Sequence, residues 1–294
     1  MMNSGHAALP VKDIGRLLLR CADRPGLVAA VTTFLADAGA NIISLDQHST
    51  QQTGGIFMQR TIFHLPGLAA ARADLEREFA AGVAEPFAID FRLTEAAKPK
   101  RVALMASTED HCLLDLLWRS QRGELDMTVV MVVANHADLA DQVRAFGVPF
   151  IHVPATKDIR EQAEQRQLEL LRGNVDLVVL ARYMQILSPN FLDQVGCPLI
   201  NIHHSFLPAF IGAAPYRRAK ERGVKLVGAT AHYVTEDLDE GPIIEQDVVR
   251  VDHRHSVEDL VRLGADVERA VLSRAVQWHC EDRVIRYGNQ TVVF

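Results

Sequence analysis

The sequence has few cysteines, no long apolar run and no excess of positive charge. Its four cysteines lie far apart and form no Cys-x-x-Cys pair, so neither a zinc knuckle nor a disulfide framework is indicated. No segment reaches the roughly 18 uninterrupted apolar residues of a membrane span. The formal net charge of −6 gives no support to binding of nucleic acid or of an anionic membrane.

The amino terminus lacks a basic region followed by an apolar stretch, so we expect no secretory signal and a cytoplasmic location. The scattered cysteines agree with this, as buried free thiols in a reducing compartment. With 294 residues, 48% of them hydrophobic and 23% charged, the chain can build one large or two modest globular domains.

Residues 1–95 show alternating strand and helix patterns. We expect strands at 16–21, 41–48, 56–64 and 87–93, and helices at 27–38 and 68–79. The order strand, helix, strand, strand, helix, strand predicts a ferredoxin-like unit. Its first loop contains Asp23, Pro25, Gly26 and Leu27. We expect Asp23 to cap the first helix, Pro25 to preset its first turn and Gly26 to let a ligand approach the backbone.

A polar, proline-containing stretch at 96–100 predicts a linker, and a second domain is expected over 101–294. Strand patterns at 101–107, 127–133, 150–153, 175–180 and 199–202 alternate with helical patterns at 112–122, 138–146 and 159–172. This alternation predicts an open, mostly parallel α/β sheet. The long helical pattern Val257–Cys280 is interpreted as a helix that packs behind the sheet.

The most informative stretch runs from Asn201 to Pro208, directly after an apolar strand. Ligands of α/β proteins bind where such strands end. Asn201 and His203 are two residues apart, so in a strand they face the same side. An asparagine N–H can donate to a developing oxyanion, and a histidine can carry a proton. The residues alone also allow a plainer interpretation, a polar strand end with one histidine satisfied in the core.

A second polar cluster follows at 228–244 and turns at Asp239-Glu240-Gly241-Pro242. The turn can bring the Asp239 carboxylate to the end of the first strand. Asn201, His203 and Asp239 would then form a general acid–base site.

These motifs resemble a known family. Asn201-Ile-His-x-Ser-x-Leu-Pro, Gly228-x-Thr-x-His-x-Val and Asp237-x-Asp-x-Gly-Pro-Ile-Ile are similar to the fold of formyltransferases that use 10-formyltetrahydrofolate. The first loop resembles the Asp-x-Pro-Gly signature of the ACT domain, a small module that binds amino acids and dimerises. The whole chain resembles the formyltetrahydrofolate deformylase family. The fold class implied is α/β, a ferredoxin-like ACT domain followed by a Rossmann-like formyltransferase domain with a mostly parallel sheet.

The resemblance also implies roles for single residues. Asn201, His203 and Asp239 are the implied catalytic residues. The implied substrate-binding residues are Arg182, Met184, Gln185, Ile186, Leu187, His232, Thr235 and Asp237. Main-chain groups near 185–187 would read the pterin edge, although residues 180–188 also fit an ordinary strand running into a helix. The implied regulatory ligand site comprises Asp23, Pro25, Gly26 and Leu27.

The activity implied is hydrolysis of 10-formyltetrahydrofolate to formate and tetrahydrofolate, which would feed formate to purine synthesis and balance the one-carbon folate pool. Folate is then the substrate, and no cofactor is expected. The expected partners are this substrate, an amino-acid effector and other copies of the chain in a homodimer or homotetramer.

Two alternatives stay open. One is transfer of the formyl group to an amine acceptor. The loop Ser107-Thr108-Glu109-Asp110-His111 argues against a phosphorylated acceptor, because it has no glycine and its two carboxylates would repel phosphate. The other is an amino-acid sensor with a dead enzyme fold, which the intact Asn201, His203 and Asp239 argue against.

The histidines also raise the question of a metal. His203, His204, His232, His253 and His255 could combine with Asp237, Asp239 or Glu240. No His-x-x-x-His or His-x-x-Glu-His spacing occurs, and His203 and His204 are adjacent and point apart. We therefore expect no catalytic metal.

Overall fold

The computed structural model describes residues 12–208 and 215–294, and these form two compact units. The first unit runs up to Pro99 and also includes Asp282–Ile285 and Val292–Phe294. The second unit comprises Lys100–Glu281 and Arg286–Thr291. The sequence-based division gave all of 101–294 to the second domain, whereas two short segments near the carboxyl end belong with the first.

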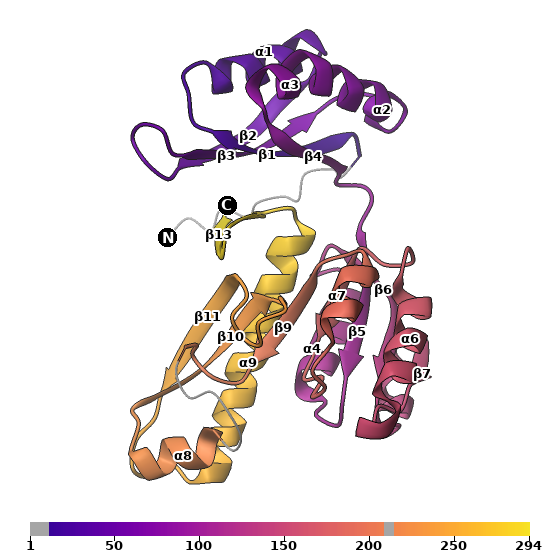
Figure 1. Ribbon diagram of the computed structural model, residues 1–294, viewed down its shortest axis with the longest axis vertical. Coiled ribbons are helices and arrows are strands. Elements are labelled where there is room, and N and C mark those ends of the chain that lie inside the picture. Colours follow the sequence, from indigo (N-terminus) through magenta and orange to yellow (C-terminus); the bar gives the residue numbers. More distant parts are fainter. Residues whose placement is uncertain (1–11, 209–214) are drawn as a thin grey trace. The chain divides into compact units, whose positions relative to one another are not determined.

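The first unit is a four-stranded antiparallel sheet with helices on one face (Figure 1). The strand order is β2-β3-β1-β4. The elements are β1 (Ile14–Ala22), α1 (Leu27–Asp37), β2 (Asn41–Ser49), β3 (Ile56–His64), α2 (Leu68–Phe79), the π-helix η1 (Ala80–Ala84), α3 (Glu85–Phe87) and β4 (Asp90–Glu95). The predicted ferredoxin-like order is confirmed.

Side-chain alternation explains why this sheet has one helical face. Leu17, Leu19 and Cys21 point to the same side of β1 and pack with Val31 and Leu35 of α1. All five are buried, so the helices cover an apolar surface that would otherwise face water.

Asp282 explains why a carboxyl-terminal segment belongs to the first unit. Its side chain is only 1% exposed. It accepts a hydrogen bond from Thr94 at 2.8 Å, and Arg92 lies 2.9 Å from its other oxygen. Arg16 is 3.6 Å away. A buried carboxylate requires such partners, and β1 and β4 supply them.

Two local predictions in the first unit are wrong. The strand expected at 87–93 begins only at Asp90, because the preceding helix continues through η1 and α3 and ends with Ala88 in the left-handed conformation. Asp23 does not cap α1. The N-cap is Gly26, at φ 95°, and the Asp23 side chain instead accepts a hydrogen bond from Ser49.

The second unit contains a seven-stranded mixed sheet in the order β11-β10-β9-β8-β5-β6-β7. The strands are β5 (Lys100–Ala106), β6 (Met127–Ala134), β7 (Phe150–His152), β8 (Leu177–Leu180), β9 (Leu199–His203), β10 (Leu226–Tyr233) and β11 (Ile243–Arg250). The first five pair in parallel, and β10 and β11 are antiparallel. The prediction of a mostly parallel α/β sheet is confirmed.

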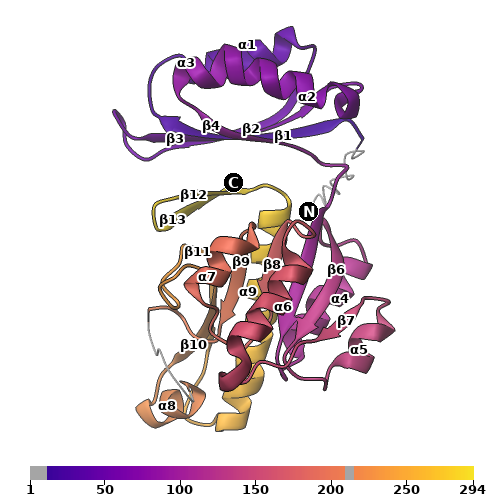
Figure 2. The same ribbon diagram turned by 45° about the vertical axis from the view of Figure 1, so that its right-hand side comes forward.

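Helices cover both faces of this sheet (Figure 2). They are α4 (His111–Gln121), α5 (Ala140–Ala145), the 3-10 helix η2 (Lys157–Ile159), α6 (Arg160–Leu171), α7 (Pro189–Val195), α8 (Pro215–Arg222) and α9 (Val257–Cys280). α4 and α9 pack against each other, as do α6 and α7. None of the helices in the described residues is both long enough and apolar enough to cross a membrane. β12 (Val284–Tyr287) and β13 (Gln290–Val293) form a small two-stranded sheet.

The sheet brings the polar loops of the second unit together. β5, β8 and β9 are parallel neighbours, so residues that follow Ala106, Leu180 and His203 emerge at one edge. The chain also changes direction here, because β6 lies on one side of β5 and β8 on the other. A switch of this kind opens a crevice between the loops, where ligands bind in doubly wound folds.

Candidate functional site

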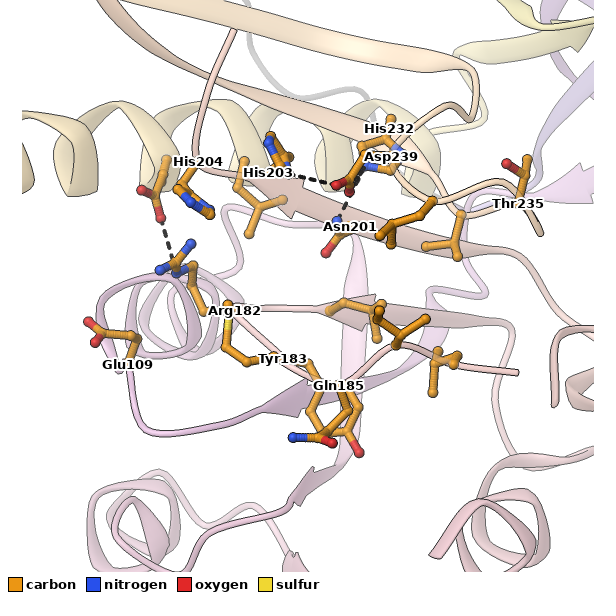
Figure 3. Close-up of a pocket in the computed structure, with 18 of the residues that line it drawn as sticks. Glu109, Arg182, Tyr183, Gln185, Asn201, His203, His204, His232, Thr235 and Asp239 are labelled. Carbon is orange, nitrogen blue, oxygen red and sulfur yellow. Dashed lines mark hydrogen bonds and ion pairs between the residues drawn. The ribbon is translucent and has the colours of Figure 1, made fainter. Parts of the chain in front are cut away.

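A cavity of about 680 Å³ lies within the second unit at this edge (Figure 3). Its walls come from the loop before α4, the segment after β8, the end of β9, the loop after β10, and helices α8 and α9. All three predicted catalytic residues and all eight predicted substrate residues line it. They are Asn201, His203, Asp239, Arg182, Met184, Gln185, Ile186, Leu187, His232, Thr235 and Asp237.

Asn201 and His203 share one face of β9, as their spacing predicts. The cross-strand partner of Asn201 on β10 is His232, and the two side chains meet, with 3.3 Å between Asn201 Nδ2 and His232 Nε2. His203 and His232 are buried. The strand register therefore assembles an amide and two imidazoles on one surface.

Asp239 completes this group from the loop that follows β10. One carboxylate oxygen lies 3.2 Å from His203 Nδ1, and the other lies 3.6 Å from His232 Nε2. Bonds from His203 and His232 hold the pKa of Asp239 well below its usual range, against the effect of burial. Asp239 is therefore ionised at neutral pH. It also has a left-handed backbone, φ 59°, a conformation that costs free energy in a non-glycine residue and clusters at functional sites.

The hydrogen bonds of His232 fix its proton. Nδ1 lies 2.9 Å from the carbonyl oxygen of Tyr233, which can only accept, so Nδ1 carries a hydrogen. Nε2 lies 3.3 Å from Asn201 Nδ2 and 3.6 Å from an oxygen of Asp239. The His232 ring therefore contacts both the Asn201 amide and the Asp239 carboxylate.

Gly241 keeps the Asp239 loop in place. A Cβ atom at this position would lie 1.8 Å from the carbonyl oxygen of Tyr233. The next residue, Pro242, accepts a hydrogen bond from the Tyr233 N–H at 2.9 Å. The loop therefore returns directly against the end of β10, and only glycine fits at the point of closest approach.

We expect Gly241→Ala to lower the free energy of unfolding by roughly 1–3 kcal/mol, because the added methyl group must displace backbone. Thermal unfolding followed by circular dichroism measures this. Gly82→Ala is the control, since a Cβ atom there meets nothing within 4 Å. Equal melting temperatures for both variants would contradict the assigned role of Gly241.

One side of the cavity is apolar although it is accessible. Met184, Ile186 and Leu238 are 57%, 60% and 59% exposed, which is unusual for large apolar side chains gathered around one cavity. The segment that carries Met184 and Ile186 is anchored at both ends. The Met184 N–H donates to Ser107 Oγ at 2.9 Å, and the Ser188 N–H donates to Glu164 at 2.9 Å. An anchored apolar wall suits a flat heterocycle.

The opposite side is polar, and its central residue escaped the sequence interpretation. Glu268 lies on α9, a helix interpreted as a packing helix, and is 2% exposed. We call Glu268 and the three groups around its carboxylate the Glu268 cluster. The Tyr216 hydroxyl donates to it at 2.9 Å, His111 Nε2 lies at 2.8 Å, and Arg182 Nε lies at 3.5 Å. α9 thus contributes to the cavity as well as to the core.

The charge state of the Glu268 cluster follows from its contacts. Burial opposes ionisation of Glu268, but His111, Arg182 and Tyr216 outweigh it and hold its pKa below the usual value. Burial and the adjacent Glu268 charge raise the pKa of Tyr216, so Tyr216 keeps its proton. The nearby His204 has its pKa lowered to about 4 by burial and by the charges of Arg182 and His203, and is neutral at pH 7.

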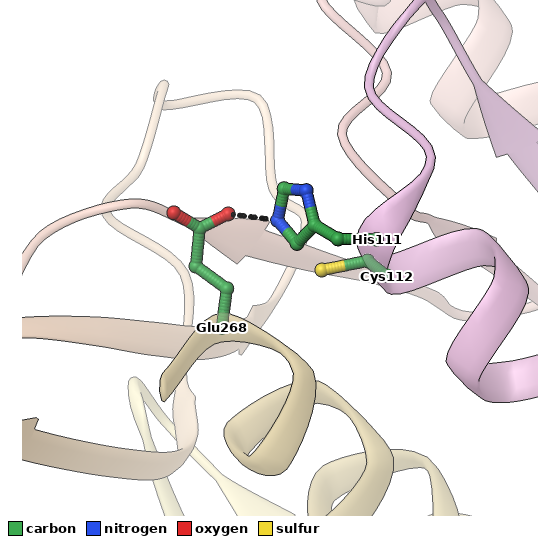
Figure 4. Close-up of side chains that lie close together, drawn as sticks. All are labelled: His111, Cys112 and Glu268. Carbon is green, nitrogen blue, oxygen red and sulfur yellow. Dashed lines mark hydrogen bonds and ion pairs between the residues drawn. The ribbon is translucent and has the colours of Figure 1, made fainter. Parts of the chain in front are cut away.

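Three potential metal ligands lie together in this region. The ligand atoms of His111, Cys112 and Glu268 are within 4.8 Å of one another (Figure 4). Burial and the Glu268 charge raise the pKa of Cys112 well above its usual value, which opposes the thiolate a metal needs. The Arg182 cation already lies against Glu268. These features favour a hydrogen-bonded network.

The loop 107–111 differs in part from the expectation. Glu109 lines the cavity, but Asp110 does not and lies at the N-cap of α4. Ser107 points inward, donating to Asn135 at 2.7 Å. One carboxylate of this loop, and not two, therefore faces the cavity, and the second carboxylate on that side is Glu268.

The predicted regulatory residues lie together in the first unit, between β1 and α1. The Leu27 side chain is buried in the core, so only its main chain remains for a ligand. The Asp23 N–H donates to the Gly55 carbonyl at 2.8 Å, which ties this loop to the start of β3.

Comparison with known proteins agrees with the geometry. Residues 100–276 match the family Formyl transferase, and residues 15–80 match the ACT domain. The two units and the cavity thus define an ACT-containing protein of the formyl transferase family. A formyltetrahydrofolate deformylase of Mycobacterium tuberculosis is 78% identical over 282 residues, covering 96% of this chain and 91% of that protein.

Solved structures give the same result. A formyltetrahydrofolate deformylase from Pseudomonas syringae superimposes with a TM-score of 0.90 at 48% identity, covering 96% of this chain and 94% of that one. A glycinamide ribonucleotide transformylase from Symbiobacterium toebii has a TM-score of 0.62 at 31% identity, covering 67% and 94%. The chain belongs to the formyltetrahydrofolate deformylase family.

Proposed function

We propose that this protein hydrolyses 10-formyltetrahydrofolate to formate and tetrahydrofolate. The observation that carries this is the joining of Asp239 to both His203 and His232, with Asn201 beside them, in a cavity that has one apolar and one polar side. The apolar side suits the pterin, and the cluster of Asn201, His203 and Asp239 suits chemistry at a formyl carbon.

In the proposed reaction, water attacks the formyl carbon and the carbonyl electron pair moves to oxygen. An N–H of Asn201 donates to the resulting oxyanion. His203 takes a proton from the water and returns it to N10 as the carbon–nitrogen bond breaks. The oxyanion electron pair re-forms the carbonyl bond, formic acid and tetrahydrofolate leave, and formic acid releases its remaining proton to water to give formate.

Asp239 holds the His203 ring by its contact with Nδ1. Nε2 is then the nitrogen of His203 that has no hydrogen-bond partner among the described residues, so its lone pair is free to accept the proton of the attacking water. The ionised carboxylate also stabilises the imidazolium that forms when His203 accepts a proton.

The direct test is incubation of the purified protein with 10-formyltetrahydrofolate and no acceptor, with assay of formate. We expect formate to accumulate in step with tetrahydrofolate. Turnover that requires an added amine would instead identify a formyltransferase and overturn the proposal.

We propose further that the first unit binds a free amino acid near Asp23, Pro25 and Gly26 and adjusts this activity, and that the chain forms a homodimer or homotetramer. The ACT domain match supports a regulatory ligand. Rates of formate release with each free amino acid test the first point, and light scattering tests the second.

Formate for purine synthesis is the proposed use of the product. The four free cysteines support the cytoplasm as the location.

A further inference from the structure

The polar side of the cavity is continuous with the proposed catalytic residues. The adjacent His203 and His204 were expected to point apart, but the His204 ring stacks on the His203 ring, with 5.0 Å between centroids and 26° between planes. The Tyr216 ring lies 6.4 Å beyond His204, and its hydroxyl reaches Glu268. An unbroken series of side chains therefore runs from the reacting centre to the Glu268 cluster.

The position of each member of the Glu268 cluster is fixed by the fold. Tyr216 crosses α9 at Gly264, where a Cβ atom would lie 1.9 Å from its hydroxyl oxygen. Arg182 follows β8 with a left-handed backbone, φ 61°. His111 begins α4. Side chains from three separate segments thus converge on one buried carboxylate of α9, which fixes this wall of the cavity from several directions.

We propose that the Glu268 cluster makes water the nucleophile by closing the polar end of the cavity to amine acceptors. This inference rests on the proposed function. An amine must bring its carbon substituents to the formyl carbon, whereas water brings none. The apolar side of the cavity is assigned to the pterin. β9 and the Asp239 loop enclose the reacting centre on two further sides. The side occupied by His204 and Tyr216 is the direction that remains for an acceptor.

The charges at this end of the cavity also disfavour an amine acceptor. Glu109 and Glu268 line this end of the cavity together with Arg182, so two carboxylates face one guanidinium. Nearby carboxylates stabilise a protonated amine, and an ammonium group has no lone pair with which to attack. They also repel an acceptor that carries a phosphate. Water is neutral and is affected by neither.

The test compares two products in the same reaction, formate and N-formylglycinamide, with 10-formyltetrahydrofolate as donor and glycinamide as a small primary amine. Glu268→Ala and Tyr216→Ala each open the wall. We expect the ratio of formylated amine to formate to rise about 10-fold or more in either variant. Glu95→Ala is the control, a buried carboxylate of the first unit that is outside the cavity, and should keep the parent ratio.

The ratio of formylated amine to formate tests this inference independently of the proposed function. Formate release by the parent without amine decides the proposed function. If the parent releases formate but folded Glu268→Ala and Tyr216→Ala keep its ratio, the inference is overturned and the proposed function stands. A parent that formylates glycinamide as readily as the variants also overturns it. Should loss of Glu268 prevent folding, Tyr216→Ala decides, because it leaves the buried carboxylate with His111 and Arg182.

Discussion

Asp239→Asn is expected to lower kcat for 10-formyltetrahydrofolate hydrolysis by about 10³- to 10⁴-fold, as in other sites where a carboxylate orients a histidine. The amide keeps the shape of the side chain but loses its charge. It no longer stabilises a protonated His203 and can present N–H groups where the histidines need an acceptor. The variant should still fold because the strands remain paired, but its melting temperature should fall, since the ionised carboxylate is stabilised by His203 and His232 in the folded state.

Asp247→Asn is the matched control for this variant. Asp247 is on β11, is paired with Arg274 at 2.7 Å, and does not line the cavity. Its activity should stay at the parent level. If Asp239→Asn retains activity within about threefold of the parent, Asp239 is not the carboxylate the mechanism needs.

Asn201→Ala is expected to lower kcat by about 10²- to 10³-fold, the usual effect of removing one oxyanion donor. KM should change little, because the proposed hydrogen bond strengthens only as charge develops on the formyl oxygen. Steady-state kinetics with separate kcat and KM values measure both effects.

Asn190→Ala on the exposed surface of α7 is the control, since Asn190 bonds only to Gln194 among the described contacts and is outside the cavity. A variant Asn201→Ala with normal kcat and a raised KM would assign Asn201 to ground-state binding of folate. The proposed oxyanion role would then be wrong.

The sequence predicted the regular elements well where their apolar patterns were strong. α9 was placed at its observed bounds, Val257–Cys280, and β3 at Ile56–His64. It also predicted that Asn201 and His203 share a face, because that depends only on the strand period. The wrong strand at 87–93 lay where a helix continued through an irregular π-helical turn, which has no simple period.

The predicted catalytic and substrate residues came from motif order and resemblance, and they do gather in one cavity. Glu268 could not be found in this way. In the sequence, Glu268 is only one of several polar residues in the amphipathic pattern of α9. Its role near the cavity depends on Tyr216, His111 and Arg182, which are distant in sequence and approach it only in the folded chain.

The sequence by itself determined the two α/β folds, the strand that carries Asn201 and His203, and the candidate residues, because periodicity and local motifs are properties of neighbouring residues. The tertiary structure alone decided which nitrogen of His203 faces Asp239, that Gly241 holds the Asp239 loop against β10, and that Asp282 returns to the first unit. It also placed Glu268 on the wall of the cavity, in contact with Tyr216, His111 and Arg182. Each of these depends on distances between segments far apart in the chain, and such distances are fixed only when the sheet is assembled.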